Sequence, residues 1–455
     1  MIIRKNSFAF GGGAFGDEGK GRIVDLYVSR LAKKGQVIVY RDNGGANAGH
    51  TVEFKDGQRV ALHQLPSGIF IKGATVVLGK GMVLHPGDLL AEIKEVKRIS
   101  GGKIPAKIMI DEMAVLSLDT HRAFEAALQN WQSGSKGATG RGISPAYADV
   151  LLRHPLRARD LAAWRLSALK QHYQLYQALL RGLGEDLAKM KVLTMNGKLV
   201  SVGSQQQFVN NLKQSLKVIK PLVKNVYPFL ETAWKNKKVS FVFEKAQGVG
   251  LDARWGVYPD VTASDTTFAG IFAATEGIIN PEEIELRAAV IKATYMSSVG
   301  IRRLPSVMTG RLADKIREDA HEYGATTKRP RGITYLDLPA LHYFTKVGRA
   351  NALVLTHMDI VYPKTPIKIC VGYKSKGKTV GYRPDQEYLD QVKPVYKLLP
   401  TWDQKAIRMA RKTKKLPKNA RQFLKFVSQE LNLPILAITT GPKRNQGLPI
   451  KMKEL

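Results

Sequence analysis

Short apolar runs alternate with helical patterns along most of this chain, and this alternation restricts its fold more than any other feature. Each run is rich in β-branched residues and therefore predicts a buried strand. The runs occupy residues 7–10, 37–40, 75–78, 107–110, 239–243, 352–356, 367–371 and 434–438. Strands that alternate with helices form parallel sheets in which helices cover both faces.

The segments between the runs predict the helices. One helical pattern covers residues 23–34, and a basic region rich in Gln and Leu covers about 161–237, with breaks near Gly182 and Asn196. We therefore predict an α/β fold with a large, mainly parallel central sheet flanked by helices. Because we find no repeat or linker, we predict a single domain over 1–455. In such sheets the ligand loops lie at the carboxyl ends of the strands.

The charge balance predicts anionic partners. The 455 residues include 71 Lys and Arg against 38 Asp and Glu, a formal net charge of +33. A nucleic-acid-binding protein is one interpretation, but the basic tract at 405–418 has no interleaved aromatic residues, so we interpret it as a solvated helix face and expect no nucleic-acid partner. The single cysteine, Cys370, excludes an intrachain disulfide framework. With neither a signal peptide nor an apolar stretch of membrane-spanning length, we predict a cytoplasmic protein.

The first strand runs into the loop GGGAFGDEGKG, residues 11–21. Glycines followed by Lys20 at the start of a helix supply backbone N–H groups and a cation, which together bind phosphates. The loop departs from the usual P-loop pattern, which requires glycine at Ala14 and a hydroxyl at Gly21. Asp17 can take the place of that hydroxyl beside magnesium or act as a base. The alternative is a surface turn with a capping acid.

A second glycine-rich loop, NGGANAGHT at residues 43–51, follows the next strand. Its small residues leave backbone groups accessible to a ligand, and His50 lies among them as a donor or acid. A lone histidine is more often structural, but a neighbouring phosphate loop and an acid reverse that interpretation. Polar loops also follow three later strands, with the sequences EKAQG, THMD and TTGPKR. Five such loops predict one ligand site.

These motifs resemble the adenylosuccinate synthetase family, whose members join IMP and aspartate at the expense of GTP. The resemblance begins with GDEGKGRIVDL and GGANAGHT and extends over roughly residues 5–445. Further matching segments, in family order, are LHQLPSGI, LGKGMVLHP, ATGRGISPAYAD, FEKAQGVGLDARWGVYPDVTASDTT, EYGATTKRP and ITTGPKR. Two long glycine motifs in sequence make the resemblance specific.

The resemblance implies a mechanism with Mg2+ as cofactor. Asp17 would remove the proton from N1 of the purine while the 6-oxygen attacks the γ-phosphate, giving a 6-phosphoryl intermediate from which the amino group of aspartate displaces phosphate. Lys20 and His50 would neutralise charge during the transfer. Asp17 and the backbone of Gly49 would bind the metal. The products would be adenylosuccinate, GDP and phosphate, a step in AMP biosynthesis.

The resemblance also implies the binding residues. For IMP they are Asn47, Thr139, Gln247, Thr262 and Arg153, the last reaching in from a second subunit, which implies a homodimer. For GTP they are Gly16, Glu18, Gly19, Gly21, His357, Asp359, Thr440, Gly441 and Pro442. Taken alone, Gln247 and Thr262 would be interpreted as turn and cap residues.

Three departures from the family pattern bear on specificity. His357 stands where the guanine-reading loop has lysine, although Asp359 keeps the acceptor. Ser298 stands where the aspartate-binding loop has its arginine, and Arg302 or Arg303 can supply that contact instead. Ala138 replaces a threonine near the purine phosphate.

These departures leave one close alternative, a 2-aminoadenylosuccinate synthetase that acts on dGMP with ATP or GTP. Relatives of that kind typically replace the acid of the first loop with a smaller residue. The retained Asp17 favours IMP.

Overall fold

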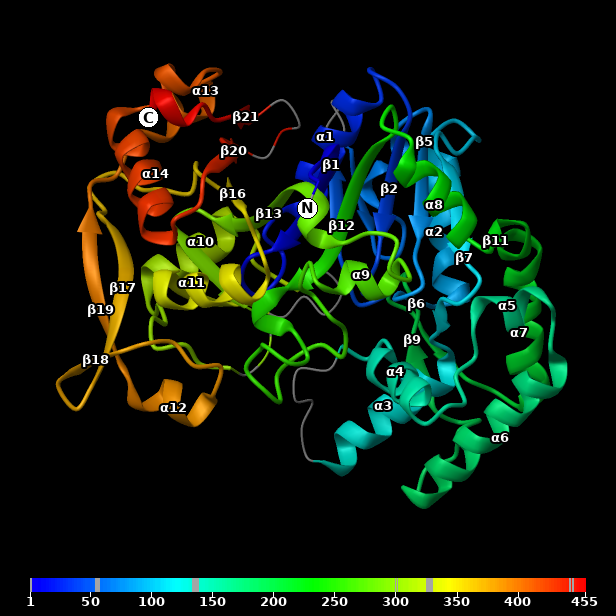
Figure 1. Cartoon of the computed structure of the whole chain (residues 1–455). Helices are drawn as coiled ribbons and strands as arrows, with labels where there is room; N and C mark the ends of the chain where they lie inside the picture. Colours follow the sequence, from blue (N-terminus) through cyan, green and yellow to red (C-terminus); the bar gives the residue numbers. More distant parts are fainter. Residues whose placement is uncertain are drawn as a thin grey trace.

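The computed structural model describes residues 2–53, 58–132, 139–298, 300, 302–324, 330–441, 443 and 446–455. A ten-stranded sheet runs through the molecule (Figure 1). In spatial order its strands are β11 (Val223–Lys224), β7 (Lys107–Asp111), β5 (Ala74–Leu78), β2 (Val37–Arg41), β12 (Ser240–Gly248), β1 (Arg4–Gly12), β13 (Ile284–Lys292), β16 (Ala352–Thr356), β20 (Ile435–Thr439) and β21 (Gly447–Pro449). All neighbouring strands pair in parallel except β20 and β21. The predicted fold class is confirmed.

Helices cover both faces of the sheet on the side of β2. Val37 and Val39 of β2 belong to a core that includes α1 (Lys20–Leu31) and α2 (Pro86–Ile99). The alternate residues, Ile38 and Tyr40, pack in a second core with α8 (Tyr227–Lys235) and α9 (Gly270–Ala274). Successive side chains of a strand point to opposite faces, so a strand covered on both sides reads as a continuous apolar run.

A third core lies on the side of β16 and β20, where α11 (Leu338–Val347) and α14 (Lys418–Leu431) pack. Beside it is a five-stranded sheet, at the left of Figure 1. Its strands are β14 (Tyr295–Ser298), β15 (Gly332–Asp337), β17 (Ile367–Ser375), β18 (Lys378–Val380) and β19 (Lys393–Leu399). The α10 helix (Arg311–Asp319) contacts β15, and two further helices are α12 (Gln386–Gln391) and α13 (Gln404–Met409).

The segment predicted as a helical region holds four helices and three short strands, among them β11 of the large sheet. It contains α5 (Ala158–Ala162), α6 (Leu166–Gly182), α7 (Gln205–Ile219) and α8, with a hairpin of β9 (Lys191–Leu193) and β10 (Leu199–Ser201) after the first break. It packs beside α3 (Asp119–Trp131) and α4 (Ile143–Leu151). Ser204 caps α7 by accepting from the backbone of Gln207. Two small pairings complete the structure, β3 (His50–Glu53) with β4 (Arg59–Leu62) and β6 (Val83–Leu84) with β8 (Val115–Leu116).

One strand was predicted in the wrong sheet, and one strand of the large sheet was not predicted. The run at 367–371 lies in β17 of the five-stranded sheet, not in the large sheet. The prediction omitted β13, which pairs with β1 and β16 in the middle of the large sheet. Its sequence, IELRAAVIK, combines three charged residues with two helix-forming alanines, and these obscure the strand pattern.

Among the described residues, no helix is both long and apolar enough to cross a membrane. The single domain over residues 1–455 stays a prediction.

Candidate active site

The loops that follow β1, β2, β12, β16 and β20 meet around one cavity of about 770 Å³. The predicted site residues that line it are Gly16, Asp17, Gly19, Lys20, Gly21, Asn47, Gly49, His50, Thr139, Gln247, Thr262, Arg302, His357, Asp359 and Gly441. The carboxyl ends of parallel strands share one edge of a sheet, which brings these distant segments together.

The first loop owes its shape to Glu18. The Glu18 carboxylate accepts from the backbone N–H of Gly16 at 2.7 Å and of Ala14 at 3.2 Å, and it lies 2.8 Å from Lys20 Nζ. It is buried and does not line the cavity. Glycine at position 19 has a φ of 85°, in the left-handed region, and leads into α1. The Glu18 side chain therefore holds the loop and positions Lys20, and the predicted contact of Glu18 with GTP stays a prediction.

Asp17 faces the cavity and pairs with an arginine that the sequence analysis did not single out. Its Oδ2 lies 2.5 Å from Arg331 Nη2, while Nη1 of the same arginine lies 2.7 Å from Glu322. Glu322 also pairs with Lys292. Burial opposes the ionisation of Glu322, but Lys292 and Arg331 together hold its pKa well below its usual range. Arg331 is therefore held in place on one side and presents a cation to Asp17.

His50 has a buried carboxylate partner. Its Nδ1 lies 2.5 Å from Glu244, which accepts from the hydroxyl and backbone N–H of Ser67 at 2.6 and 2.8 Å. Burial lowers the pKa of His50, and the charge of Glu244 opposes this only in part. The neutral ring therefore donates from Nδ1 to Glu244, and its other nitrogen keeps a lone pair. An anion bound in the cavity would favour the protonated ring.

The side chains predicted to hold the purine contain buried polar atoms without partners. Within the described part of the chain, Asn47 Oδ1 and both amide atoms of Gln247 make no hydrogen bond. Asn43 joins the loop after β2 to the end of β12, since its Oδ1 accepts from the backbone N–H of Ala246 at 2.9 Å. A buried amide without a partner costs about 1–3 kcal/mol. A bound polar molecule would relieve this cost.

The two neighbouring arginines predicted for aspartate lie in different environments. The side chain of Arg302 is 1% exposed, lies 3.0 Å from Asp260 Oδ2, donates to the hydroxyl of Ser298 and lines the cavity. Arg303 is 69% exposed and pairs at 2.6 Å with Asp390 on the surface. Of the two, Arg302 lines the cavity and Arg303 does not. Ser298 lies behind Arg302, off the cavity wall.

The loop after β16 brings His357 and Asp359 to the cavity. The backbone N–H of His357 donates to Thr439 Oγ1 at 3.1 Å, which joins this loop to the end of β20. Burial, reinforced by the charge of Lys292, lowers the pKa of His357 to about 4. The ring is therefore neutral at neutral pH. Arg408, another residue that the sequence analysis did not single out, pairs with Asp359 at 2.9 Å.

Three other residues were predicted for the site, and of these Thr440 and Arg153 are not among those that line the cavity. Thr440 is buried behind the cavity wall, where its backbone N–H donates to Gln446 O at 2.8 Å. Pro442 lies outside the described residues. Arg153 lies away from the cavity, exposed after α4 and beside Leu151 and Leu152, which are 84% and 66% exposed.

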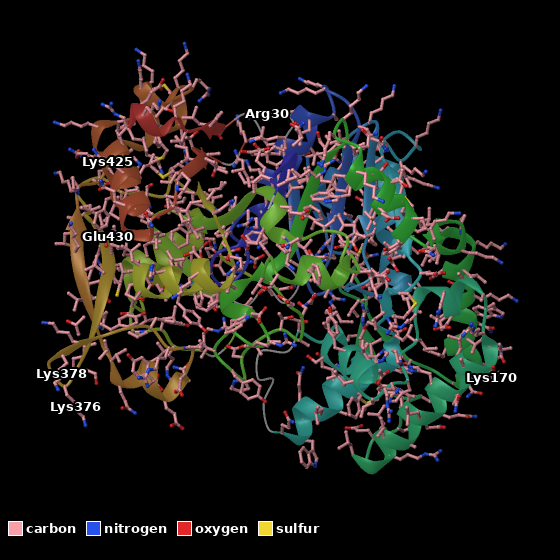
Figure 2. The ribbon with its side chains drawn as sticks, in the orientation of Figure 1. Arg30, Lys170, Lys376, Lys378, Lys425 and Glu430 are labelled. Carbon is pink, nitrogen blue, oxygen red and sulfur yellow. The ribbon has the colours of Figure 1, made fainter. Side chains whose placement is uncertain are left out.

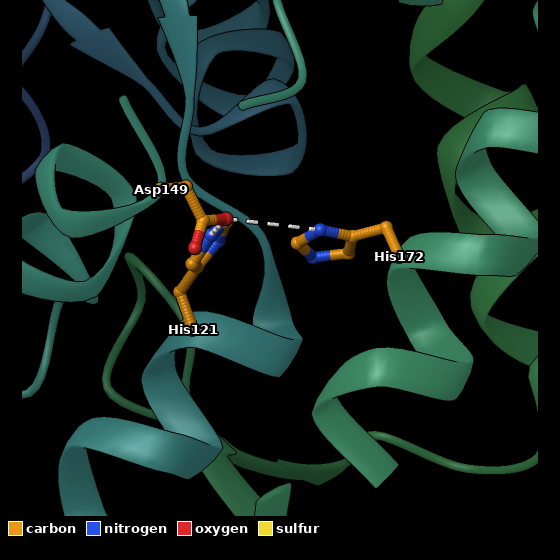
Figure 3. A group of neighbouring side chains, drawn as sticks. All are labelled: His121, Asp149 and His172. Atoms are coloured by element: carbon orange, nitrogen blue, oxygen red, sulfur yellow. Dashed lines mark hydrogen bonds and ion pairs between the residues drawn. The ribbon is translucent and has the colours of Figure 1, made fainter. Parts of the chain in front are cut away.

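A His–Asp–His cluster outside the cavity has metal-ligating residue types but not the protonation that a metal requires (Figure 3). His121 Nε2 lies 2.9 Å from Asp149, and the backbone N–H of Leu118 donates to its Nδ1 at 2.9 Å. Since Nδ1 accepts, the ring proton lies on Nε2 and points at Asp149. A metal on Nε2 would require a doubly deprotonated ring. We interpret the cluster, with His172, as a hydrogen-bonded network that joins α3, α4 and α6.

A comparison with known proteins identifies the family. A family model described as adenylosuccinate synthetase matches residues 10–448. The chain belongs to this family. Adenylosuccinate synthetase of Halothermothrix orenii is 33% identical over 96% of this chain and 97% of its own. That of Chlorobium chlorochromatii is 35% identical over 96% and 95%. These matches confirm the predicted family and enzyme type, a ligase of purine nucleotide synthesis.

Two solved structures are similar to this one. The fully ligated adenylosuccinate synthetase of Plasmodium falciparum has a TM-score of 0.85 and 28% identity, covering 98% of this chain and all of its own. The succinoaminodeoxyadenylate synthetase of cyanophage S-2L, bound to dGMP and dATP, has a TM-score of 0.60 and 16% identity, covering 100% and 97%. The second likeness shows a shared fold.

Several site residues were missed by the motif analysis. Glu244 lies within the quoted segment FEKAQG, and Arg331 directly follows the quoted segment EYGATTKRP, so attention to charged residues at motif edges would have found both. Arg408 lies in the tract interpreted as a solvated helix face, and no sequence pattern distinguishes it from its basic neighbours.

Proposed function

We propose that this enzyme joins IMP and L-aspartate with hydrolysis of GTP, forming adenylosuccinate, GDP and phosphate through 6-phosphoryl-IMP. The observation that carries the proposal is the convergence of Asp17, Lys20 and His50 on one cavity beside the unpartnered amides of Asn47 and Gln247. A base, cations and amide groups at one site are the parts that phosphoryl transfer to a purine oxygen requires.

The proton and charge steps can be assigned to residues of the chain. Asp17 takes the proton from N1 of IMP, and Arg331 pairs with its carboxylate until substrate binds. Lys20, fixed by Glu18, neutralises the γ-phosphate as the 6-oxygen attacks it. The His50 imidazole binds the transferring phosphoryl group and is supported by Glu244 when it becomes protonated. Aspartate nitrogen then displaces phosphate from the ring carbon.

Mg2+ fits the donors present. The Asp17 carboxylate and the Gly49 carbonyl are hard oxygen ligands, and both residues line the cavity. The ion, when bound, would neutralise phosphate charge. We propose these two residues as its protein ligands.

The remaining roles follow the geometry. We propose that Asn47, Thr139, Gln247 and Thr262 hold IMP and that Arg302 holds the aspartate carboxylate. Gly16, Gly19, Gly21, His357, Asp359 and Gly441 would then contact GTP. Arg153, away from its own cavity, serves the site of the partner in a homodimer, and its exposed leucine neighbours support an interface there.

The high positive charge does not point to a nucleic-acid groove. In Figure 2 the labelled basic side chains Arg30, Lys170, Lys376 and Lys425 lie at separate edges of the molecule. Spread charge of this kind suits solubility and steering of anionic substrates. We propose a cytoplasmic enzyme of AMP synthesis.

The test is formation of adenylosuccinate by purified protein with IMP, aspartate, Mg2+ and either GTP or ATP. A parallel reaction with dGMP in place of IMP tests the alternative substrate. We expect product from IMP, since Asp17 is retained. No product with any triphosphate would refute the proposal, and product from dGMP alone would establish the alternative.

A further inference from the structure

The base-reading carboxylate of the GTP site carries a partner from a distant part of the chain. Arg408 of α13 donates to Asp359 Oδ2 twice, from Nε at 3.1 Å and from Nη2 at 2.9 Å. Asp359 is only 4% exposed, and both residues line the cavity. The pair therefore lies at the position where the loop after β16 would meet the purine base of the triphosphate.

The segment that carries Arg408 is fixed against this loop. Trp402 Nε1 donates to Met358 O at 2.9 Å, and Gln404 Nε2 donates to Asp359 O at 2.7 Å. Ile407, one residue before the arginine, is fully buried in the core. These contacts place α13 beside the base loop and make Arg408 part of the cavity wall.

The pairing changes what the carboxylate can accept. A carboxylate oxygen has two lone pairs, and both lone pairs of Oδ2 are engaged by Arg408. Oδ1 remains, and within the described residues nothing donates to it. Guanine presents two adjacent donors, N1–H and the 2-amino group, which a carboxylate reads by giving one oxygen to each.

We propose that Arg408 determines the base specificity of the triphosphate site by leaving Asp359 a single oxygen for the purine. The inference rests on the proposed function and extends it. With one oxygen available, Asp359 accepts a hydrogen bond from N1–H of the base, and the 2-amino group adds little binding free energy. The enzyme therefore uses GTP and ITP, which lacks that group, with similar efficiency.

The test compares kcat/KM for GTP and ITP in the wild type and in Arg408→Leu, which removes the guanidinium and keeps an apolar stem. In the wild type we expect the kcat/KM values for GTP and ITP to differ by less than about threefold. In the variant we expect GTP to be favoured about tenfold or more, since the freed Asp359 oxygen gains a charged hydrogen bond to the 2-amino group. Binding of GDP and IDP, measured by calorimetry, gives the same comparison without turnover.

Arg411→Leu is the matched control. Arg411 lies three residues further along, and its guanidinium donates to backbone carbonyls of Arg408 and Ala410, not to Asp359. Its GTP to ITP ratio should equal that of the wild type. Arg408→Gln provides a second variant if the leucine variant does not fold.

Three outcomes would overturn the inference: a wild-type preference of tenfold or more for GTP, an unchanged ratio in both Arg408 variants, or exclusive use of ATP. The first two leave the proposed reaction intact, and exclusive use of ATP would change only its triphosphate, whereas the joining of IMP and aspartate fails only if no triphosphate supports adenylosuccinate formation. The two conclusions are therefore tested separately.

Discussion

Neighbouring arginines give a direct test of the aspartate site. We consider Arg302→Lys and Arg303→Lys, which both keep the positive charge and lose the planar fork of the guanidinium. The side chain of Arg302 is 1% exposed at the cavity, whereas that of Arg303 is 69% exposed and pairs with Asp390. The same chemical change is thus made one residue apart in two different environments.

The magnitude follows from the contact that is lost. An arginine grips a carboxylate with two charged hydrogen bonds, and lysine retains one. Each such bond contributes about 1.5–3 kcal/mol. The KM for aspartate should therefore rise about 10- to 150-fold in Arg302→Lys. Lysine can still pair with Asp260, so the buried carboxylate is not left alone.

The assay is steady-state formation of adenylosuccinate with aspartate varied at saturating IMP and GTP. Arg302→Lys should raise the KM for aspartate while the KM for IMP stays near the wild-type value. Arg303→Lys should leave both unchanged. An unchanged aspartate KM in the first variant, or a large increase in the second, would refute this placement of the aspartate carboxylate.

Three further predictions follow from the site and its surroundings. Asp17→Asn should lower kcat about 1,000-fold through loss of the base while IMP still binds in calorimetry, and a variant with a tenth of wild-type activity would contradict that role. Gln247→Ala should raise the KM for IMP about tenfold without lowering the unfolding temperature, because the amide has no described partner to lose; the opposite pattern would indicate a structural residue. Burial lowers the pKa of His172 well below its usual range, so below about pH 6.5 the unfolded chain binds the proton more readily. The free energy of unfolding should therefore decrease as pH decreases through that value. In thermal unfolding curves recorded from pH 5 to 8, His172→Gln should make the unfolding temperature less dependent on pH. An equally steep pH dependence in the variant would exclude His172 as its source.

Local motifs predicted the parts of the site that lie within one loop. Gly16, Asp17, Gly19 and Lys20 are consecutive or nearly so, and a strand, a glycine turn and a helix start are sufficient to place them together. The same holds for Asn47 and His50 after β2. The role of Glu18 was not accessible in this way, because the direction of its side chain depends on how the loop closes upon itself.

Contacts between distant segments could not be read from spacing. Arg331 reaches Asp17 from the position just before β15, and Arg408 reaches Asp359 from α13. The strand β13, hidden by charged residues and alanines, was recognisable only by its pairing between β1 and β16. Each of these depends on packing of elements whose order in space differs from their order in the chain.

The sequence by itself determined the α/β class, the ligand edge of the sheet and the family, because periodicity and contiguous glycine motifs are local properties of the chain. Only the tertiary structure decided between Arg302 and Arg303, gave Glu18 its place inside the loop and set Arg408 on the base-reading carboxylate. A charged side chain pairs with a particular partner only when folding buries it and fixes the direction in which it points. Residue type alone specifies neither the burial nor the direction.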